Sequence, residues 1–235
     1  PDAMADVTLL EAPGQREEAL AIALRLRQAV EDGQRAAVVT PDRMLTRRVT
    51  SALDRWNILP DDSAGTPAQL TPPGRLLRHV AGLFVAPLTA EMLLTLLKHP
   101  LTHSGADRGP HLLNTRELEL FIRKTGMPYP QPAALRAWGT TKARGDWAGW
   151  VAAQVCDRAR PGVRPLADWV GDLIALAEAI CAGPGLDGSG GLWHEAAGRK
   201  LHGVMQGLAR EAGHGADMSA RDFADLLGAL LSREE

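Results

Sequence analysis

The chain has 235 residues, of which 45% are hydrophobic and 23% are charged, and its formal net charge is −2. This balance is typical of a globular protein with a hydrophobic core, arranged as one large domain or two small ones. No apolar run approaches the roughly 20 residues of a membrane span, and no signal peptide opens the chain, so we expect a soluble, cytoplasmic protein with no membrane partner.

The first third of the chain predicts alternating strands and helices. Val7–Glu11 is a short β-rich run, and apolar residues then recur at helical spacing over Glu17–Glu31. Ala36–Thr40 is apolar without alternation, as in a buried parallel strand, and Asp42 is expected to cap the helix that follows. With a third short strand near Ile58–Ala64, this order predicts a partial parallel sheet of about three strands.

From Pro72 onward the pattern is helical. Thr89 and Ser219 are expected N-terminal caps, and two loops rich in Pro or Gly, Gly126–Asp146 and Ala182–Gly191, separate groups of helices. The expected helices are Pro73–Phe84, Thr89–His99, Pro110–Thr125, Trp147–Arg158, Arg164–Ala182, Leu192–Ala212 and Ser219–Ser232.

Five short stretches carry most of the functional information. They are LLEAPGQREEALAIA (9–23), AAVVTPDRMLTRRV (36–49), DDSAGTPAQLTPPGRLLR (61–78), LLTLLKHPLT (93–102) and TRELE (115–119). Together they resemble the middle of the AddB family, the subunit of the AddAB helicase–nuclease that processes DNA double-strand breaks, and the proteobacterial branch is the closest match. The resemblance is specific over residues 7–120.

The resemblance implies an internal fragment of a UvrD-like motor. Its fold class would be α/β plus all-α: a partial RecA-like parallel sheet lobe at residues 1–85 and a helical insertion subdomain at residues 86–235. The motor of this family is generally regarded as degenerate, so Arg43, which follows an expected strand, would not be catalytic. Both ends are expected to be cuts in a longer protein, and a cut sheet edge would invite self-association.

The implied partners are DNA and an AddA-like helicase–nuclease subunit, in homologous recombination and double-strand break repair. In the parent family the complex uses ATP and Mg, and the C-terminal exonuclease domain holds an iron–sulfur cluster. We expect none of these cofactors in this segment. The alternative function is a regulatory or adaptor α/β domain that binds a protein and makes no DNA contact.

Motifs for catalysis are sparse. The chain has no G-x-x-x-x-G-K-[ST] phosphate loop, and the expected strand-to-helix turn Ala12–Gln15 has one glycine and no lysine, so it is a poor phosphate cradle. The neighbouring acids Asp61 and Asp62 are expected to stabilise a turn. The sequence therefore predicts no catalytic, cofactor-binding or metal-binding residue, and a segment inactive alone.

Histidines and cysteines are interpreted as structural. Four histidines lack a carboxylate or cysteine at ligand spacing; they are His79, His99, His103 and His111. Cys156 and Cys181 lie on expected helices, and we expect buried free thiols in a reducing compartment.

The middle of the chain is basic. Residues 108–144 hold seven cationic and two anionic side chains, which favours contact with phosphate, although a solvated surface is the alternative. The predicted DNA-binding residues are Arg108, Arg123, Lys124, Lys142 and Arg144. Tryptophans flank two of them, at Trp138, Trp147 and Trp150, and could stack bases; the helical spacing of the last two favours the core instead.

Overall fold

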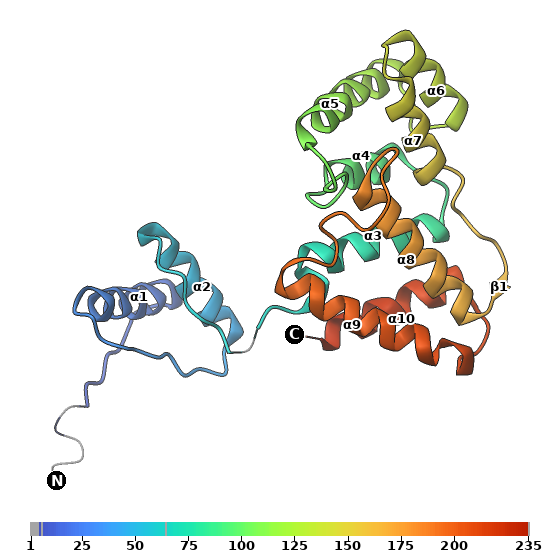
Figure 1. Cartoon of the computed structure of the whole chain (residues 1–235). Coiled ribbons are helices and arrows are strands. Elements are labelled where there is room, and N and C mark those ends of the chain that lie inside the picture. Colours follow the sequence, from blue (N-terminus) through green and yellow to red (C-terminus); the bar gives the residue numbers. More distant parts are fainter. Residues whose placement is uncertain (1–4, 6, 64, 235) are drawn as a thin grey trace. The chain divides into compact units, whose positions relative to one another are not determined.

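The computed structural model describes residues 5, 7–63 and 65–234 and divides the chain into two compact units, residues 1–64 and 65–235. Figure 1 shows that helices dominate both units. The sequence places the boundary at residues 85 and 86, after the first helix of the helical region, whereas the contacts place it before that helix. Among the described residues, no helix is both long and apolar enough to cross a membrane.

The first unit is a pair of helices. α1 spans Gln15–Glu31 and α2 spans Arg43–Leu53. The predicted cap of α2 is confirmed, since the Asp42 carboxylate accepts a 2.7 Å hydrogen bond from the backbone N–H of Met44. The two helices share a small apolar core whose buried side chains are Ala19, Ala23, Leu45, Val49 and Leu53.

The predicted α/β fold class is wrong. Val7–Glu11 and Ala36–Thr40 form no strand, and neither do residues 58–63; Ala64, the last residue of the expected third strand, lies outside the described residues. The apolar side chains of these segments are exposed, with Leu9 at 83% and Val39 at 97%. A strand forms only where a neighbouring strand takes up its backbone N–H and C=O groups, and the described residues of this unit supply none. The described residues of this unit therefore contain no sheet edge through which the predicted self-association could occur.

The second unit is an all-helical bundle with one short ribbon. Its strands, β1 Val163–Arg164 and β2 Met218–Ser219, pair antiparallel and make the only sheet found in the described ranges. Its helices are α3 Pro72–Val85, α4 Ala90–Lys98, α5 Arg108–Thr125, α6 Pro132–Thr141, α7 Gly145–Val155, α8 Leu166–Ala182, α9 Glu195–Glu211 and α10 Ala220–Arg233.

Helices α3 and α8 lie at the centre of this unit. In Figure 1, α5, α6 and α7 (green to yellow) gather at one end of the unit, while α9 and α10 (orange to red) lie at the other. The centre is filled by large side chains that are fully buried, among them Leu76, Leu77, Trp169, Leu173 and Phe223. One apolar core therefore connects the two ends.

The seven helices predicted for this region are confirmed, with ends shifted by a few residues. Thr89 accepts from the N–H of Met92, and Ser219 forms a reciprocal capping box with Asp222, as the sequence indicates. The sequence does not predict helix α6, because the prolines and glycines of Gly126–Asp146 indicate a loop there. Pro132 instead occupies the first turn of α6, where a missing N–H has no effect on the helical hydrogen bonds.

Candidate nucleic-acid interface

Helix α5 carries three of the five predicted DNA-binding residues. It begins where the Asp107 carboxylate accepts a hydrogen bond from the N–H of Gly109, and it ends at Gly126, whose φ of +64° suits a left-handed cap. One face of the helix, which includes His111, Leu118 and Ile122, is buried. The opposite face is left to solvent.

Two of the predicted residues are held inside the fold. The Arg108 guanidinium donates to the carbonyl of Thr102 at 3.1 Å and to that of His99 at 2.9 Å. Arg144 pairs with the Glu117 carboxylate at 3.3 Å and lies over the ring of Trp138, 5.9 Å from its centroid. Both cations stabilise the packing of the helical unit, so they are poorly placed to bind phosphate.

Arg123 is exposed but paired. Glu119 accepts from Lys98 at 2.6 Å and from Arg123 at 2.7 Å. Both hydrogen bonds lower the pKa of the Glu119 carboxyl, and the bond from Lys98 has the larger effect. The two carboxylates within residues 108–144 are thus both neutralised by ion pairs inside the chain.

The excess positive charge of this region faces solvent. Lys124 and Lys142, the two remaining predicted residues, are exposed. Within the part of the chain that the structure describes, their ammonium groups have no hydrogen bond or ion pair. The same holds for Arg116 and Arg136, which the sequence counts in its charge balance but does not single out. We call Arg116, Lys124, Arg136 and Lys142 the basic surface.

The exposed face of α5 also carries leucines, which the sequence analysis missed. Leu112, Leu113 and Leu120 are 43%, 54% and 59% exposed. By the 3.6-residue repeat they fall within about 120° of the helix circumference, together with Arg116 and Lys124. A helical projection of the sequence would have shown them opposite the buried face. We call these three side chains the leucine stripe.

The three tryptophans beside the cations are not available to stack bases. Trp138, Trp147 and Trp150 are all buried and belong to the main core. The core interpretation of Trp147 and Trp150 is confirmed, and none of these three rings is exposed for base stacking.

Comparison of this chain with models of known protein families, with curated proteins and with solved structures found no match.

Two of the four histidines that the sequence singles out, His99 and His111, are buried. His111 is buried, donates through Nε2 to the carbonyl of Leu97 at 2.7 Å and accepts through Nδ1 from the indole N–H of Trp147 at 3.1 Å. Its ring stacks on His103 with centroids 5.1 Å apart. Among the described residues, no group of three or more side chains has metal-ligand geometry. These contacts give His111 a packing role.

The cysteines are buried free thiols, as predicted. Burial raises the pKa of Cys156 to about 11 and raises that of Cys181 as well. Since the thiolate is the nucleophile, neither residue is poised for reaction.

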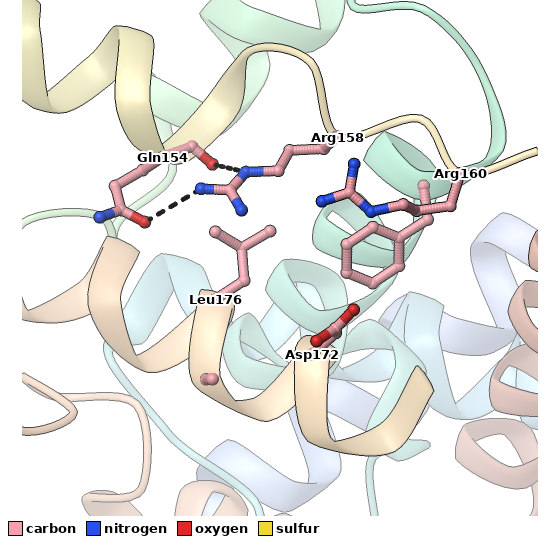
Figure 2. Close-up of a pocket in the computed structure, with 7 residues that line it drawn as sticks. Gln154, Arg158, Arg160, Asp172 and Leu176 are labelled. Carbon is pink, nitrogen blue, oxygen red and sulfur yellow. Dashed lines mark hydrogen bonds between the residues drawn. The ribbon is translucent and has the colours of Figure 1, made fainter. Parts of the chain in front are cut away.

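A small cavity of about 190 Å³ lies beside α8. Figure 2 shows Arg158 and Arg160 beside it, with Asp172 from α8 on the other side. Arg158 donates to the carbonyl of Gln154 at 2.9 Å, and Asp172 pairs with Arg164 at 3.0 Å. Its volume falls below the roughly 300 Å³ of typical ligand pockets, and these polar groups already have partners, so the cavity is a packing feature.

Proposed function

We propose that the chain is a DNA-binding and scaffolding segment of an AddB-like subunit, part of a helicase–nuclease that repairs DNA double-strand breaks by homologous recombination together with an AddA-like subunit. Two things support the proposal: the resemblance over residues 7–120, and the basic surface. The observation that carries it is the set of unpaired cations around α5 and α6, beside carboxylates that are already neutralised.

The basic surface suits contact with phosphate rather than with bases. Its lysines and arginines are spread over two helices and the turn after α6, and no exposed aromatic ring from Trp138, Trp147 or Trp150 accompanies them. Phosphate contacts fix a protein on DNA without reading its sequence. The expected binding is therefore independent of sequence and sensitive to salt.

Reversing two lysines tests this surface. We expect Lys124→Glu with Lys142→Glu to weaken binding to a labelled duplex about equally for several unrelated sequences. The slope of log K against log salt should fall in magnitude by about 2, since each phosphate contact contributes about 0.9. The measurement is fluorescence anisotropy across a salt series. The sequence alone would have suggested Arg144, but reversing it would also break its pair with Glu117.

The matched control makes the same charge change elsewhere on the helical unit. Arg199→Glu with Arg210→Glu alters two exposed cations of α9 and should leave the salt slope unchanged. Equal weakening by both double variants would reduce the effect to net charge and count against a localised interface.

A protein-binding adaptor with no DNA contact is the second candidate, and the leucine stripe favours it. Exposed apolar side chains grouped on one face are typical of protein interfaces. For this candidate the wild-type chain binds no duplex DNA. Leu113→Ser with Leu120→Ser should then reduce co-purification of an AddA-like subunit from the same source by several fold, because apolar anchors supply much of the affinity of an interface.

The control for that experiment uses leucines of similar exposure on other parts of the unit. Leu186→Ser with Leu226→Ser changes side chains that are 45% and 38% exposed and should leave co-purification unaffected. If the stripe variant retains its partner fully, the leucines are solvated surface and the adaptor candidate loses its support.

A further inference from the structure

The first unit contains a basic hollow that none of the sites above includes. It lies between the start of α1 and one side of α2, and its volume is about 590 Å³. Four arginines and a serine contribute to its wall: Arg16 from α1, Arg47, Arg48 and Ser51 from α2, and Arg55 from the turn after α2. We call this the arginine hollow.

The hollow is rich in positive charge and has no carboxylate in its lining. Acidic residues do lie nearby, at Glu17 and Glu18 in the first turn of α1 and at Asp54 beside Arg55, but none of them lines the hollow. Within the described residues, the four guanidinium groups of its wall have neither a hydrogen bond nor an ion pair.

Two other arginines of the same unit, both on α1, have partners within the chain. Arg27 pairs with Glu31 at 2.7 Å and lies over the ring of Trp56, while Arg25 donates to Gln28 at 2.8 Å. Arg25 and Arg27, toward the C-terminal end of α1, therefore have partners within the chain, whereas the arginines of the hollow have no counter-charge among the described residues. Four unpaired guanidinium groups around one concave surface repel one another until an anion joins them.

The spacing of the cations suits a chain of charges. Arg47 and Ser51 are four residues apart on α2, which separates them by about 6 Å along the helix axis. Arg55 extends this row into the turn that follows α2. Arg16 faces this row from α1 across the hollow. The buried contact of Ala19 with the apolar face of α2 fixes the two helices against each other, which holds the row and its opposite wall in register.

We propose that the arginine hollow binds the phosphodiester backbone of a nucleic acid strand. Guanidinium groups form paired hydrogen bonds with phosphate oxygens, and the Ser51 hydroxyl can donate a further one. No aromatic side chain lines the hollow, so it offers bases nothing to stack on. Binding is to the backbone and does not depend on sequence.

An acidic protein segment fits this surface less well. Protein interfaces depend on a few buried apolar or aromatic anchors, and the apolar part of this lining consists of Ala19, Leu20 and Ala52. A single small anion would engage only part of the row along α2. The inference rests on the proposed function for the identity of the ligand, but it uses residues of the first unit only.

The test reverses two exposed arginines of the row. We expect Arg47→Glu with Arg55→Glu to weaken binding of the full chain to a labelled mixed-sequence 20-nucleotide single strand by at least about tenfold near 0.1 M salt. The salt slope should fall by about 1.4, at about 0.7 per phosphate for single strands. Neither side chain belongs to the apolar core, and circular dichroism checks the helix content.

A control double variant keeps the charge change within the same unit. Arg25→Glu with Arg35→Glu alters two exposed cations that do not line the hollow, and it should leave the affinity within about twofold because salt screens charges that make no direct contact with the strand. Equal losses in both variants would overturn the inference.

The remaining outcomes separate this site from the basic surface. If Lys124→Glu with Lys142→Glu removes binding and the hollow variant binds normally, the inference fails and the proposed function stands. If only the hollow variant loses binding, the inference stands and the DNA interface proposed on the helical unit fails. If the wild-type chain binds neither the single strand nor the duplex, both the inference and the proposed DNA-binding function fail.

Two further probes identify the chemistry. The first probe is polyglutamate of the same charge as the oligonucleotide. If it binds as tightly as the oligonucleotide, and the hollow variant loses that binding, the hollow is a site for acidic protein segments and the inference is overturned. Pyrophosphate that binds as tightly as the oligonucleotide would show a small-anion site, with the same consequence. If both probes bind weakly and the single strand binds tightly, the hollow is assigned to the phosphodiester backbone.

Discussion

Replacing Trp169 with alanine should lower the free energy of unfolding of the helical unit by about 3–5 kcal/mol, the usual range for removing a buried tryptophan. Trp169 is fully buried. Its ring stacks on Phe223 of α10 with centroids 5.8 Å apart and contacts Phe84 of α3 at 5.7 Å. Its indole N–H donates to the carbonyl of Met218 in β2 at 3.0 Å.

One side chain on α8 thus connects α3, α10 and the ribbon. Arg164 also lies over the ring, 4.7 Å from its centroid. The alanine variant loses apolar burial, leaves a cavity between three elements and leaves the Met218 carbonyl without its donor. Because these losses occur at the centre of the unit, neighbouring helices have little freedom to close the gap.

Urea unfolding of the full chain, followed by circular dichroism, measures the effect. Trp169→Phe is the milder variant: it keeps a buried aromatic ring but loses the indole N–H and part of the ring volume, so it should cost less than the alanine variant, about 1–3 kcal/mol. If the alanine variant fails to fold, the phenylalanine variant still tests the contribution of this side chain to the core. A change below about 1 kcal/mol in the alanine variant would contradict this account of the core.

The helices were predictable because their signals are local. Apolar residues at a spacing of three and four, and caps such as Asp42, Thr89 and Ser219, lie within a few residues of the structure that they determine. The exception, α6, shows the limit of such signals. A proline favours a helix start as much as a loop, and only the packing of α6 against α7 decides between the two.

The sheet was not predictable in this way, because strand pairing depends on distant partners. Ala36–Thr40 has the composition of a buried strand, yet Val39 is 97% exposed. The sequence pattern indicates that this segment is able to pair and does not indicate whether a partner is present.

The candidate site was predictable only in part, for the same reason. The excess of positive charge in residues 108–144 is visible in the sequence. That Arg108 donates to two carbonyls and that Arg144 pairs with Glu117 depends on the folded chain. The arginine hollow was missed because Arg16 lies far along the chain from Arg47 and Arg55, and only the packing of α1 on α2 brings them around one surface.

Acidification from pH 7 toward pH 5 should destabilise the helical unit. Burial first, and nearby cations second, lower the pKa of His99 to about 4 from its ordinary 6.5. Burial likewise lowers the pKa of His111 to about 4. The unfolded chain therefore takes up protons at pH values where the folded chain does not, so stability is complete above about pH 6.5 and falls as the pH drops toward 4.

The size of the effect follows from the number of groups. Where the unfolded chain binds one more proton at each of the two histidines, stability should fall by about 2.7 kcal/mol per pH unit, at 1.36 kcal/mol for each group. Protonation of the folded state is resisted directly at His111, because its Nδ1 already accepts the hydrogen bond from Trp147. Half-buried His79, whose pKa is also lowered by burial and by Arg75 and Arg78, acts in the same direction.

Urea midpoints of the full chain at pH 7.5, 6.5, 5.5 and 5.0 measure the slope, in a range chosen because most carboxylates remain ionised there. His111→Gln should roughly halve the dependence on pH even if the variant is less stable at pH 7.5, since glutamine keeps a donor and an acceptor without titrating. A wild-type midpoint that stays constant between pH 6.5 and 5.0 would contradict the buried, neutral state of His99 and His111.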